Sequence, residues 1–194
     1  MNSSLEVHHV ANNEESAFEM PLPIAHGLLG ATIVAAVHTQ PSKHYYAPLL
    51  FGAVLAIAAD SDFLLVFVFH SKSWHRGFSH SLVAGLFVLF FFVWRFGKER
   101  LADALAFGLA FASHGILDYL TTREGGGVEL FWPFSREELR LGRWGLSELP
   151  SILSRVEILR ALLVEFLLFA PMLLLVLLLR KLRLKRVNYT AKAT

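Results

Sequence analysis

The sequence predicts an all-α fold, a polytopic transmembrane helix bundle of four to five spans. Apolar residues make up 55% of the 194 residues and charged residues only 18%, whereas soluble domains carry about 25% charged residues. Mean hydropathy is correspondingly high, at +0.50. The apolar residues gather into runs that approach the length of about 20 residues that a spanning helix needs. Five such stretches follow one another along the chain: 24–37, 45–69, 80–96, 101–120 and 158–179.

The first three stretches fit a span to different degrees. The first is short and contains His26 near its start, so whether it crosses the membrane completely is left open. The second is long enough but is interrupted by Asp60 and Asp62. The third has no charged residue between positions 82 and 94, and lipid explains such a run better than a soluble core does.

The last two stretches also carry ionisable residues. The fourth begins close to Asp103, where a carboxylate is favoured by the helix dipole, and holds His114 and Asp118 in its later half. The fifth is rich in leucine and contains Glu165 and Pro171. We expect both stretches to span the membrane.

Three regions follow from this pattern. Residues 1–20 contain four Glu and no Lys or Arg, which does not fit a signal peptide and predicts a mobile acidic tail. Residues 21–180 form the integral membrane domain, which includes a surface loop at 121–157. Residues 181–194 form a basic tail directly after the last span, which favours the cytoplasmic side of an inner or plasma membrane.

The surface loop has two possible placements. Trp132 and Trp144 suit the headgroup level and would hold the loop against the membrane surface. The alternative is a loop that folds back on the bundle.

Composition also excludes some partners and scaffolds: without Cys there is no disulfide or Cys-ligated zinc, and a net charge of +2 predicts no nucleic-acid partner.

Ionisable side chains within spans cost a few kcal/mol or more each, so each requires a partner or a function. Seven of them are imidazoles or carboxylates, the ligands that zinc, manganese and iron prefer. Because successive helices cross the membrane in opposite directions, all seven are expected near the same face. These candidate metal ligands are His26, Asp60, Asp62, His75, His80, His114 and Asp118.

Local spacing agrees in part with a shared site. His114 and Asp118 lie about 40° apart around a helix and so share a face. Asp60 and Asp62 lie about 200° apart on a regular helix, so either the helix loosens there or only one of them faces the site. Ser79 or Ser81 is expected to cap the helix that follows.

A weak internal repeat in the sequence also predicts that these ligands share one site. His26 precedes Asp60 by 34 residues, and His80 precedes His114 by the same number. Each of the two histidines stands before a glycine-containing helix start. Two similar hairpins would bring their ligands together about an axis along the membrane normal, although coincidence is an alternative.

The motifs together resemble the YdjM-like family of membrane-bound proteins that are regarded as metal-dependent hydrolases. The resemblance rests on the run His75-Arg-Gly-Phe-Ser-His-Ser81, the Asp-x-Asp pair, Ser113-His114 with Asp118, and Gly127-Val-Glu-Leu-Phe-Trp-Pro133. It implies that the seven candidate ligands form the family's metal site. The chain departs from the family pattern at Ala59 and Phe63, where the family often has Pro and His, and this weakens the expectation of a helix break at Asp60.

The predicted function is hydrolysis of an ester or phosphoester, with a divalent metal ion activating water. Zinc is the first choice for the ion, and manganese and iron are alternatives. Asp118 would orient His114 or act as general base, and Arg76 would hold a substrate oxygen. The substrate would be a small molecule or a lipid, including a lipid-linked ester. Ion- or proton-coupled transport and a purely structural metal are the alternatives; the oligomeric state is not predicted.

Overall fold

The fold is known from a computed structural model that describes residues 23–38, 46–71, 74–122, 126–142 and 155–193. Within those ranges every regular element is a helix, as the sequence predicts. The predicted acidic tail, residues 1–20, lies outside the described residues. At the other end, the last helix continues through most of the predicted basic tail, as far as Ala193.

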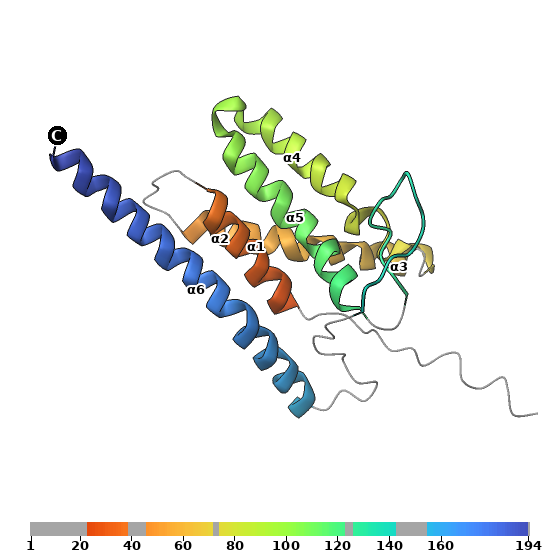
Figure 1. Ribbon diagram of the computed structural model, residues 1–194. Coiled ribbons are helices and arrows are strands. Elements are labelled where there is room, and N and C mark those ends of the chain that lie inside the picture. The colour runs from red at the N-terminus through yellow and green to blue at the C-terminus, as the bar shows by residue number, and fades with distance from the viewer. Residues whose placement is uncertain (1–22, 39–45, 72–73, 123–125, 143–154, 194) are drawn as a thin grey trace, which may run out of the picture.

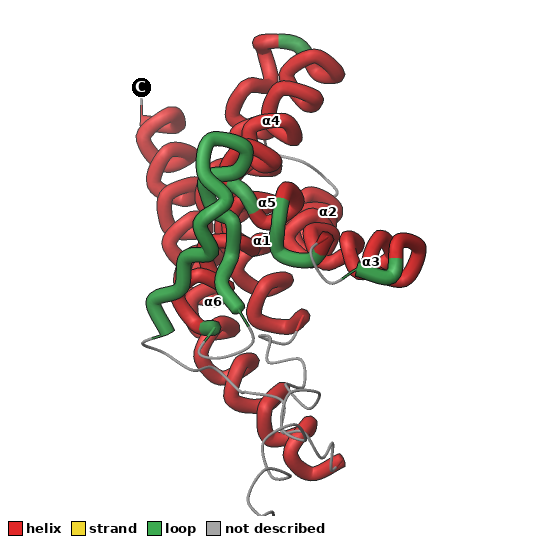
Figure 2. Tube along the Cα trace, turned by 90° about the vertical axis from the view of Figure 1, so that its right-hand side faces the viewer, coloured by secondary structure: helices red, strands yellow, loops and turns green. Residues whose placement is uncertain are grey.

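The first hairpin of the bundle is formed by α1 (Pro23–Val37) and α2 (Tyr46–Ala58). A 3₁₀ turn, η1 (Ala59–Asp62), separates α2 from α3 (Phe63–Phe69). The second predicted stretch is therefore one apolar run whose helix changes type at the Asp-x-Asp pair, without a proline. Figure 2 shows that α3 projects away from the other helices.

The second hairpin is formed by α4 (Leu82–Phe96) and α5 (Leu101–Thr121), joined by the 3₁₀ turn η4 (Lys98–Arg100). Another 3₁₀ turn, η3 (Phe78–His80), leads into α4. The long α6 (Arg155–Ala193) crosses the face of the bundle and extends beyond it at the C-terminal end (Figure 1).

Helix lengths agree with the predicted four to five spans, but three of the helical stretches are long and two are short. Three described helical stretches are long and apolar enough to cross a membrane: Tyr46–Phe69, Lys98–Thr121 and Val156–Arg183. The helices α1 and α4 are apolar but have 15 residues each, which is about 22 Å of helix against a hydrocarbon thickness of about 30 Å. The first stretch, whose crossing was left open, is thus one of two short apolar helices.

Small residues bring the helices of each hairpin into close contact. A Cβ on Gly30 in α1 would lie 2.5 Å from the carbonyl oxygen of Gly52 in α2. In the second hairpin, a Cβ on Gly108 in α5 would lie 3.0 Å from the carbonyl oxygen of Gly85 in α4. Glycine pairs of this kind let membrane helices pack backbone to backbone. Each hairpin therefore has one such close approach between its two helices.

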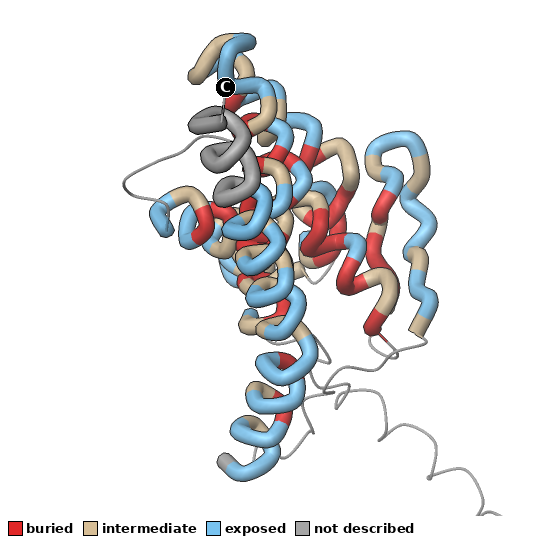
Figure 3. The backbone as a smooth tube through the Cα atoms, turned by 60° about the vertical axis from the view of Figure 1, so that its left-hand side comes forward, coloured by how far each residue is buried: buried red, intermediate tan, exposed pale blue. Residues whose placement is uncertain are grey.

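The hairpins pack through α1 and α5, and α1 also packs against α6. Between them lies an apolar core of mostly small side chains, with Val34, Leu49, Phe92 and Phe107 as its larger members. The outward faces carry many exposed leucine and phenylalanine side chains, most densely along α6 (Figure 3). An apolar exterior of this extent is suited to lipid rather than water.

Both ends of α1 contact charged side chains of α6. Near the start of α1, the amide of Ala25 donates to Glu165 Oε2 at 3.1 Å. At its end, Arg180 Nη1 donates to the carbonyl oxygen of Ala35 at 3.2 Å and also to that of His38. The carboxylate therefore sits at the positive end of the helix dipole and the guanidinium at the negative end. The two helices run parallel.

The described part of the surface loop folds back on the bundle. Leu82 N donates to the carbonyl oxygen of Leu130 at 3.0 Å, and Leu141 N donates to that of Tyr119 at 2.7 Å. The Trp132 ring contacts the Phe78 ring edge-on, with centroids 5.0 Å apart. Of the two predicted placements, the structure has the folded-back one for residues 126–142; Trp144 lies outside the described residues.

Candidate metal centre

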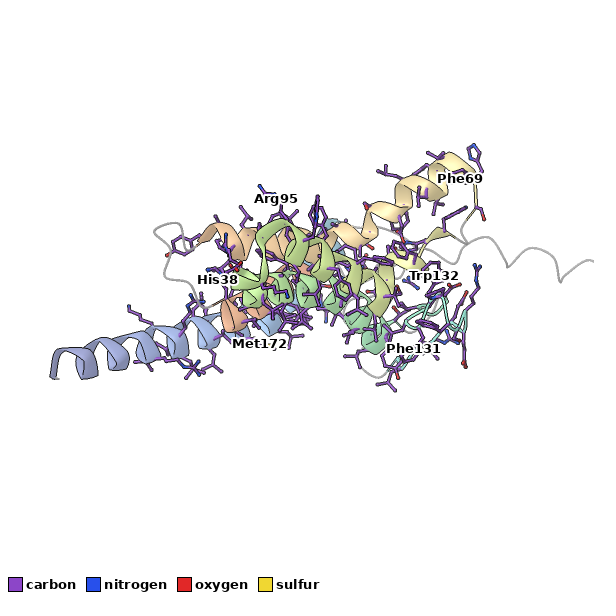
Figure 4. The ribbon with its side chains drawn as sticks, turned by 90° about the horizontal axis from the view of Figure 1, so that it is seen from above. His38, Phe69, Arg95, Phe131, Trp132 and Met172 are labelled. Atoms are coloured by element: carbon purple, nitrogen blue, oxygen red, sulfur yellow. The ribbon has the colours of Figure 1, made fainter. Side chains whose placement is uncertain are left out.

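The predicted ligands come together at one end of the bundle. This end contains the start of α1, the turns η1 and η3, and the last turns of α5, as the alternating helix directions predict. In Figure 4, Trp132 lies toward this end of the bundle and His38 toward the other. The site is thus assembled from four separate segments of the chain.

Four side-chain atoms at this end converge on one another: His80 Nε2, His114 Nε2, Asp60 Oδ1 and Asp118 Oδ2. The two Nε2 atoms are 3.1 Å apart. Asp60 Oδ1 lies 3.5 Å from His80 Nε2 and 3.2 Å from His114 Nε2. Asp118 Oδ2 lies 3.3 Å and 3.5 Å from the same two nitrogens. Donor atoms bound at about 2.1 Å around a tetrahedral ion lie about 3.4 Å from one another, so this spacing matches a ligand set.

Hydrogen bonds on the far side of each imidazole orient the two converging nitrogens. His114 Nδ1 lies 2.6 Å from the carbonyl oxygen of Ala56, which can only accept, so the proton is on Nδ1. His80 Nδ1 lies 3.0 Å from Ser79 Oγ and 3.3 Å from an Asp62 oxygen. In the neutral imidazoles both Nε2 atoms therefore present lone pairs to each other. A single proton on one Nε2 could satisfy only one of the five short contacts among these two nitrogens and two carboxylate oxygens. A cation between the four atoms would satisfy all five contacts.

Buried polar atoms without hydrogen bonds mark the same place. Among the described residues, Asp60 Oδ1 and both carboxylate oxygens of Asp118 are buried and have no hydrogen-bond partner. Such atoms are uncommon in folded proteins and call for an explanation such as an ion. The donor set therefore fits a divalent metal.

His26 extends the cluster on the side of Asp118. Its ring stacks on that of His114, with centroids 3.8 Å apart, and its Nε2 lies 3.3 Å from Asp118 Oδ1. The two oxygens of Asp118 thus face different histidines. Two groups of three residues have ligand atoms close enough to hold an ion: His26, His114 and Asp118, and also Asp60, His75 and His80.

Asp62, predicted as a ligand, lies in a different environment. Its Oδ2 accepts hydrogen bonds from Ser79 Oγ at 2.6 Å and from the backbone amide of Arg76 at 3.1 Å, while its Oδ1 lies 2.9 Å from His75 Nδ1. Both oxygens are therefore occupied by protein groups, and Asp62 is in neither group of three. Its geometry is that of a residue that orients the ligands.

The helix change at η1 explains how both aspartates face the site. The sequence left two alternatives, a loosened helix or one aspartate turned away, and the structure has the first. Asp60 reaches the two converging imidazoles, and Asp62 reaches the turn that carries His75 and His80. A short 3₁₀ segment within a long helix often accompanies a functional position.

Of the two predicted caps of α4, Ser81 has that role, because its Oγ accepts a hydrogen bond from Ala84 N at 3.1 Å. Ser79 instead connects Asp62 with His80.

Arg76, predicted to hold a substrate oxygen, is buried; its Nη1 donates to the carbonyl oxygen of Gly126 at 3.2 Å. It therefore joins the histidine turn to the folded-back loop.

The described residues of the cluster differ in how far they are exposed. The side chains of His80, His114 and Asp118 are at most 1% exposed, whereas His75 is 13% and Asp60 23% exposed. The exposed edge lies at η1, beside α3, whose Leu64 and Phe67 are strongly exposed. Among the described residues, the most exposed part of the cluster is therefore where α2 passes into α3.

Sequence reasoning missed a second polar cluster at the opposite end of the bundle. His38 Nδ1 lies 2.5 Å from Asp103 Oδ1, and Arg100 Nε donates to Asp103 Oδ2 at 2.8 Å. Asp103 does stand in the first turn of α5, as predicted, but it is also 2% exposed and paired on both oxygens. No sequence signal links His38 to a residue 65 positions later.

Comparison with known families agrees with this architecture. The family described as YdjM inner membrane protein matches residues 20–185 of the chain. The chain belongs to the YdjM inner membrane protein family. The match covers the apolar parts of the described helices α1 to α6 and every predicted ligand. Together with the apolar helices it identifies an inner membrane protein. No curated protein and no solved structure matches the chain significantly.

Proposed function

We propose that this YdjM family member is a membrane-bound metal-dependent hydrolase. The observation that carries the proposal is the convergence of His80 and His114 with Asp60 and Asp118. The two Nε2 atoms lie 3.1 Å from each other and 3.2–3.5 Å from one oxygen of each carboxylate. This spacing supports a bound divalent ion, with zinc preferred for two imidazoles and two carboxylates and manganese or iron as alternatives. Such an ion would act as a Lewis acid and would lower the pKa of a water bound to it.

The residues around the centre support distinct roles in ester or phosphoester hydrolysis. Asp118, first considered as general base, has both oxygens within 3.5 Å of histidine nitrogens and is 1% exposed, so it is better suited to ligation. His75 is more exposed, and Asp62 orients it through Nδ1. In this proposal His75 accepts the proton of the attacking water and returns it to the leaving oxygen.

Arg76 retains a proposed role in binding substrate. Its guanidinium is buried next to the histidine turn, and the planar fork of N–H donors has the geometry that binds a phosphoryl or carboxyl oxygen. The open edge beside the exposed side chains of α3 supports a substrate with an apolar part that reaches the site from the bilayer, as a lipid-linked ester would.

The two alternative functions, ion- or proton-coupled transport and a purely structural metal, have less support. A transporter needs polar groups along a path between the two faces, but the described core between the two polar clusters is apolar. The hydroxyls of Thr32 and Ser113 donate to carbonyl oxygens of their own helices. A purely structural ion would be enclosed on all sides, whereas Asp60 is 23% exposed.

The test begins with the metal content of the purified protein, measured by mass spectrometry of the metals. We expect one or two equivalents of a transition metal in the wild-type protein and a loss in the variant His80→Ala. The matched control is His70→Asn, because His70 is exposed at the end of α3 with a positive φ that Asn tolerates. Phosphoesters and carboxyl esters are then screened with the loaded wild-type protein.

Three outcomes are informative. Metal that is lost in His80→Ala and kept in His70→Asn supports the centre, and ester cleavage that depends on it supports the hydrolase. Absence of stoichiometric metal after reloading would overturn both. Bound metal together with wild-type protein that cleaves no ester in the screen would favour the structural role.

A further inference from the structure

A cavity of about 350 Å³ lies at the end of the bundle opposite the metal centre. It is formed by the C-terminal end of α1 and the facing side of α6. Its wall toward the membrane interior is aliphatic, and its wall toward the end of the bundle is basic. The residues that matter here are Ala36, Val176, Leu179, Arg180, Arg183 and His38.

One of the two arginines of the basic wall is held in place by α1. Arg180 Nη1 donates to the carbonyl oxygens of Ala35 and His38, which fixes the guanidinium beside the cavity. Arg183 follows three positions later on α6 and so lies on the same face of the helix. None of the described residues that line the cavity is a carboxylate, so its charge complements an anion.

His38 adds a buried polar atom without a partner. The residue is 4% exposed, and its Nδ1 is 2.5 Å from Asp103 Oδ1. Both Nε and Nη2 of Arg100 lie 2.8 Å from the other oxygen of Asp103. The carboxylate is thus already paired, while His38 Nε2 has no hydrogen-bond partner among the described residues. A buried atom in this state is expected to meet a ligand or water.

The position of the cavity along α6 indicates the kind of ligand. The apolar run of this helix ends at Leu179, and Arg180 begins its basic part. The cavity therefore lies at the boundary between hydrocarbon and headgroups, with its aliphatic wall on the hydrocarbon side. Anionic lipids are drawn to basic residues directly beyond a span.

We propose that this cavity binds one anionic phospholipid, with the phosphate against Arg180 and Arg183 and the glycerol and upper acyl chain against Ala36 and Leu179. The proposal is independent of the metal centre. It assigns a function to the second polar cluster, in which Asp103 holds His38 and Arg180 is held by α1, so that the phosphate meets groups that are already ordered.

The experiment uses the full-length protein in detergent micelles that contain phosphatidylglycerol or, as the neutral comparison, phosphatidylcholine. Native mass spectrometry counts the lipid molecules retained by each protein. Arg183→Gln removes one basic group from the wall, and Ala36→Phe fills the cavity without changing any charge. Lys181→Gln is the control, because Lys181 is an equally charged neighbour that does not line the cavity.

We expect the wild-type protein to retain one phosphatidylglycerol in preference to phosphatidylcholine. Arg183→Gln and Ala36→Phe should each weaken this binding about fivefold or more, while Lys181→Gln should leave it nearly unchanged. Equal losses in Arg183→Gln and Lys181→Gln with none in Ala36→Phe would overturn the proposal, because the attraction would then be diffuse surface charge. Displacement of the lipid by inorganic phosphate alone would also overturn it in favour of a free-phosphate site.

Discussion

Gly115 offers the sharpest test of the geometry of the metal centre. It lies in α5, one residue after His114, against the backbone of His80. A Cβ at this position would clash with the His80 carbonyl oxygen and would lie 2.7 Å from its carbonyl carbon, where ordinary contact begins at 3.4 Å. The obstacle is backbone, so a side-chain rotation cannot relieve it.

The magnitude follows from these distances. In Gly115→Ala, the turn η3 and α5 must separate by about 0.7 Å or more, whereas metal-ligand distances tolerate only about 0.2 Å. The Nε2 atoms of His80 and His114 should then no longer bind one ion together. We expect metal affinity to fall by about 10- to 100-fold, the range seen when groups that orient ligands are removed.

The assay is competition for the metal with a chelator of known affinity. The control is Gly27→Ala, next to His26, because the nearest neighbour of its Cβ would be the tip of the Ile57 side chain at 3.2 Å, which can move, and the next contacts are ordinary ones at 3.8 Å. Far-ultraviolet circular dichroism verifies that both variants retain their helices. Wild-type affinity in Gly115→Ala with intact helices would refute the assignment of His80 and His114 to one ion.

Two further predictions concern neighbouring groups. Ser79→Ala removes the hydroxyl that joins Asp62 to His80 and should weaken metal binding about tenfold. Ser79→Thr, which keeps a hydroxyl, should restore much of the affinity. Chelator competition measures both variants, and equal affinities in the wild-type protein and the two variants would contradict this role of Ser79. Glu165→Leu leaves the buried amide of Ala25 without its acceptor and should lower the free energy of unfolding by about 1–3 kcal/mol, whereas Glu165→Gln keeps an oxygen and should cost less. Denaturant unfolding in detergent compares these two variants, and equal losses would show that the hydrogen bond is not the reason.

The sequence predicts the membrane helices and the end of the bundle where the site lies, because both follow from local rules. Apolar run length sets the spans, and alternating helix direction places His26 and His114 near the same face. The same rules could not separate ligands from the residues that orient them. Asp60 and Asp62 are the same residue type two positions apart, and only the 3₁₀ turn between α2 and α3 sends one to the converging imidazoles and the other to Ser79.

Long-range contacts explain the other differences. The choice between Ser79 and Ser81 as cap depended on where η3 ends, and that is set by its packing against α5 and the folded-back loop. The pairing of His38 with Asp103 joins the end of one helix to the start of another, 65 residues apart. Neither residue has a spacing or motif that distinguishes it from an ordinary helix end.

The contacts of α6 with both ends of α1 have a consequence for biosynthesis. Glu165 accepts a hydrogen bond from the amide of Ala25 but is added to the chain 140 residues later. At the usual rate of protein synthesis this is a delay of roughly 7–28 s. During that time α1, only 15 residues long, lacks the two side chains that later complete its ends. The helix α1, although it is made before the other described helices, is therefore among the last to reach its final surroundings, and a chain that stops before α6 should leave His26 poorly held in the membrane.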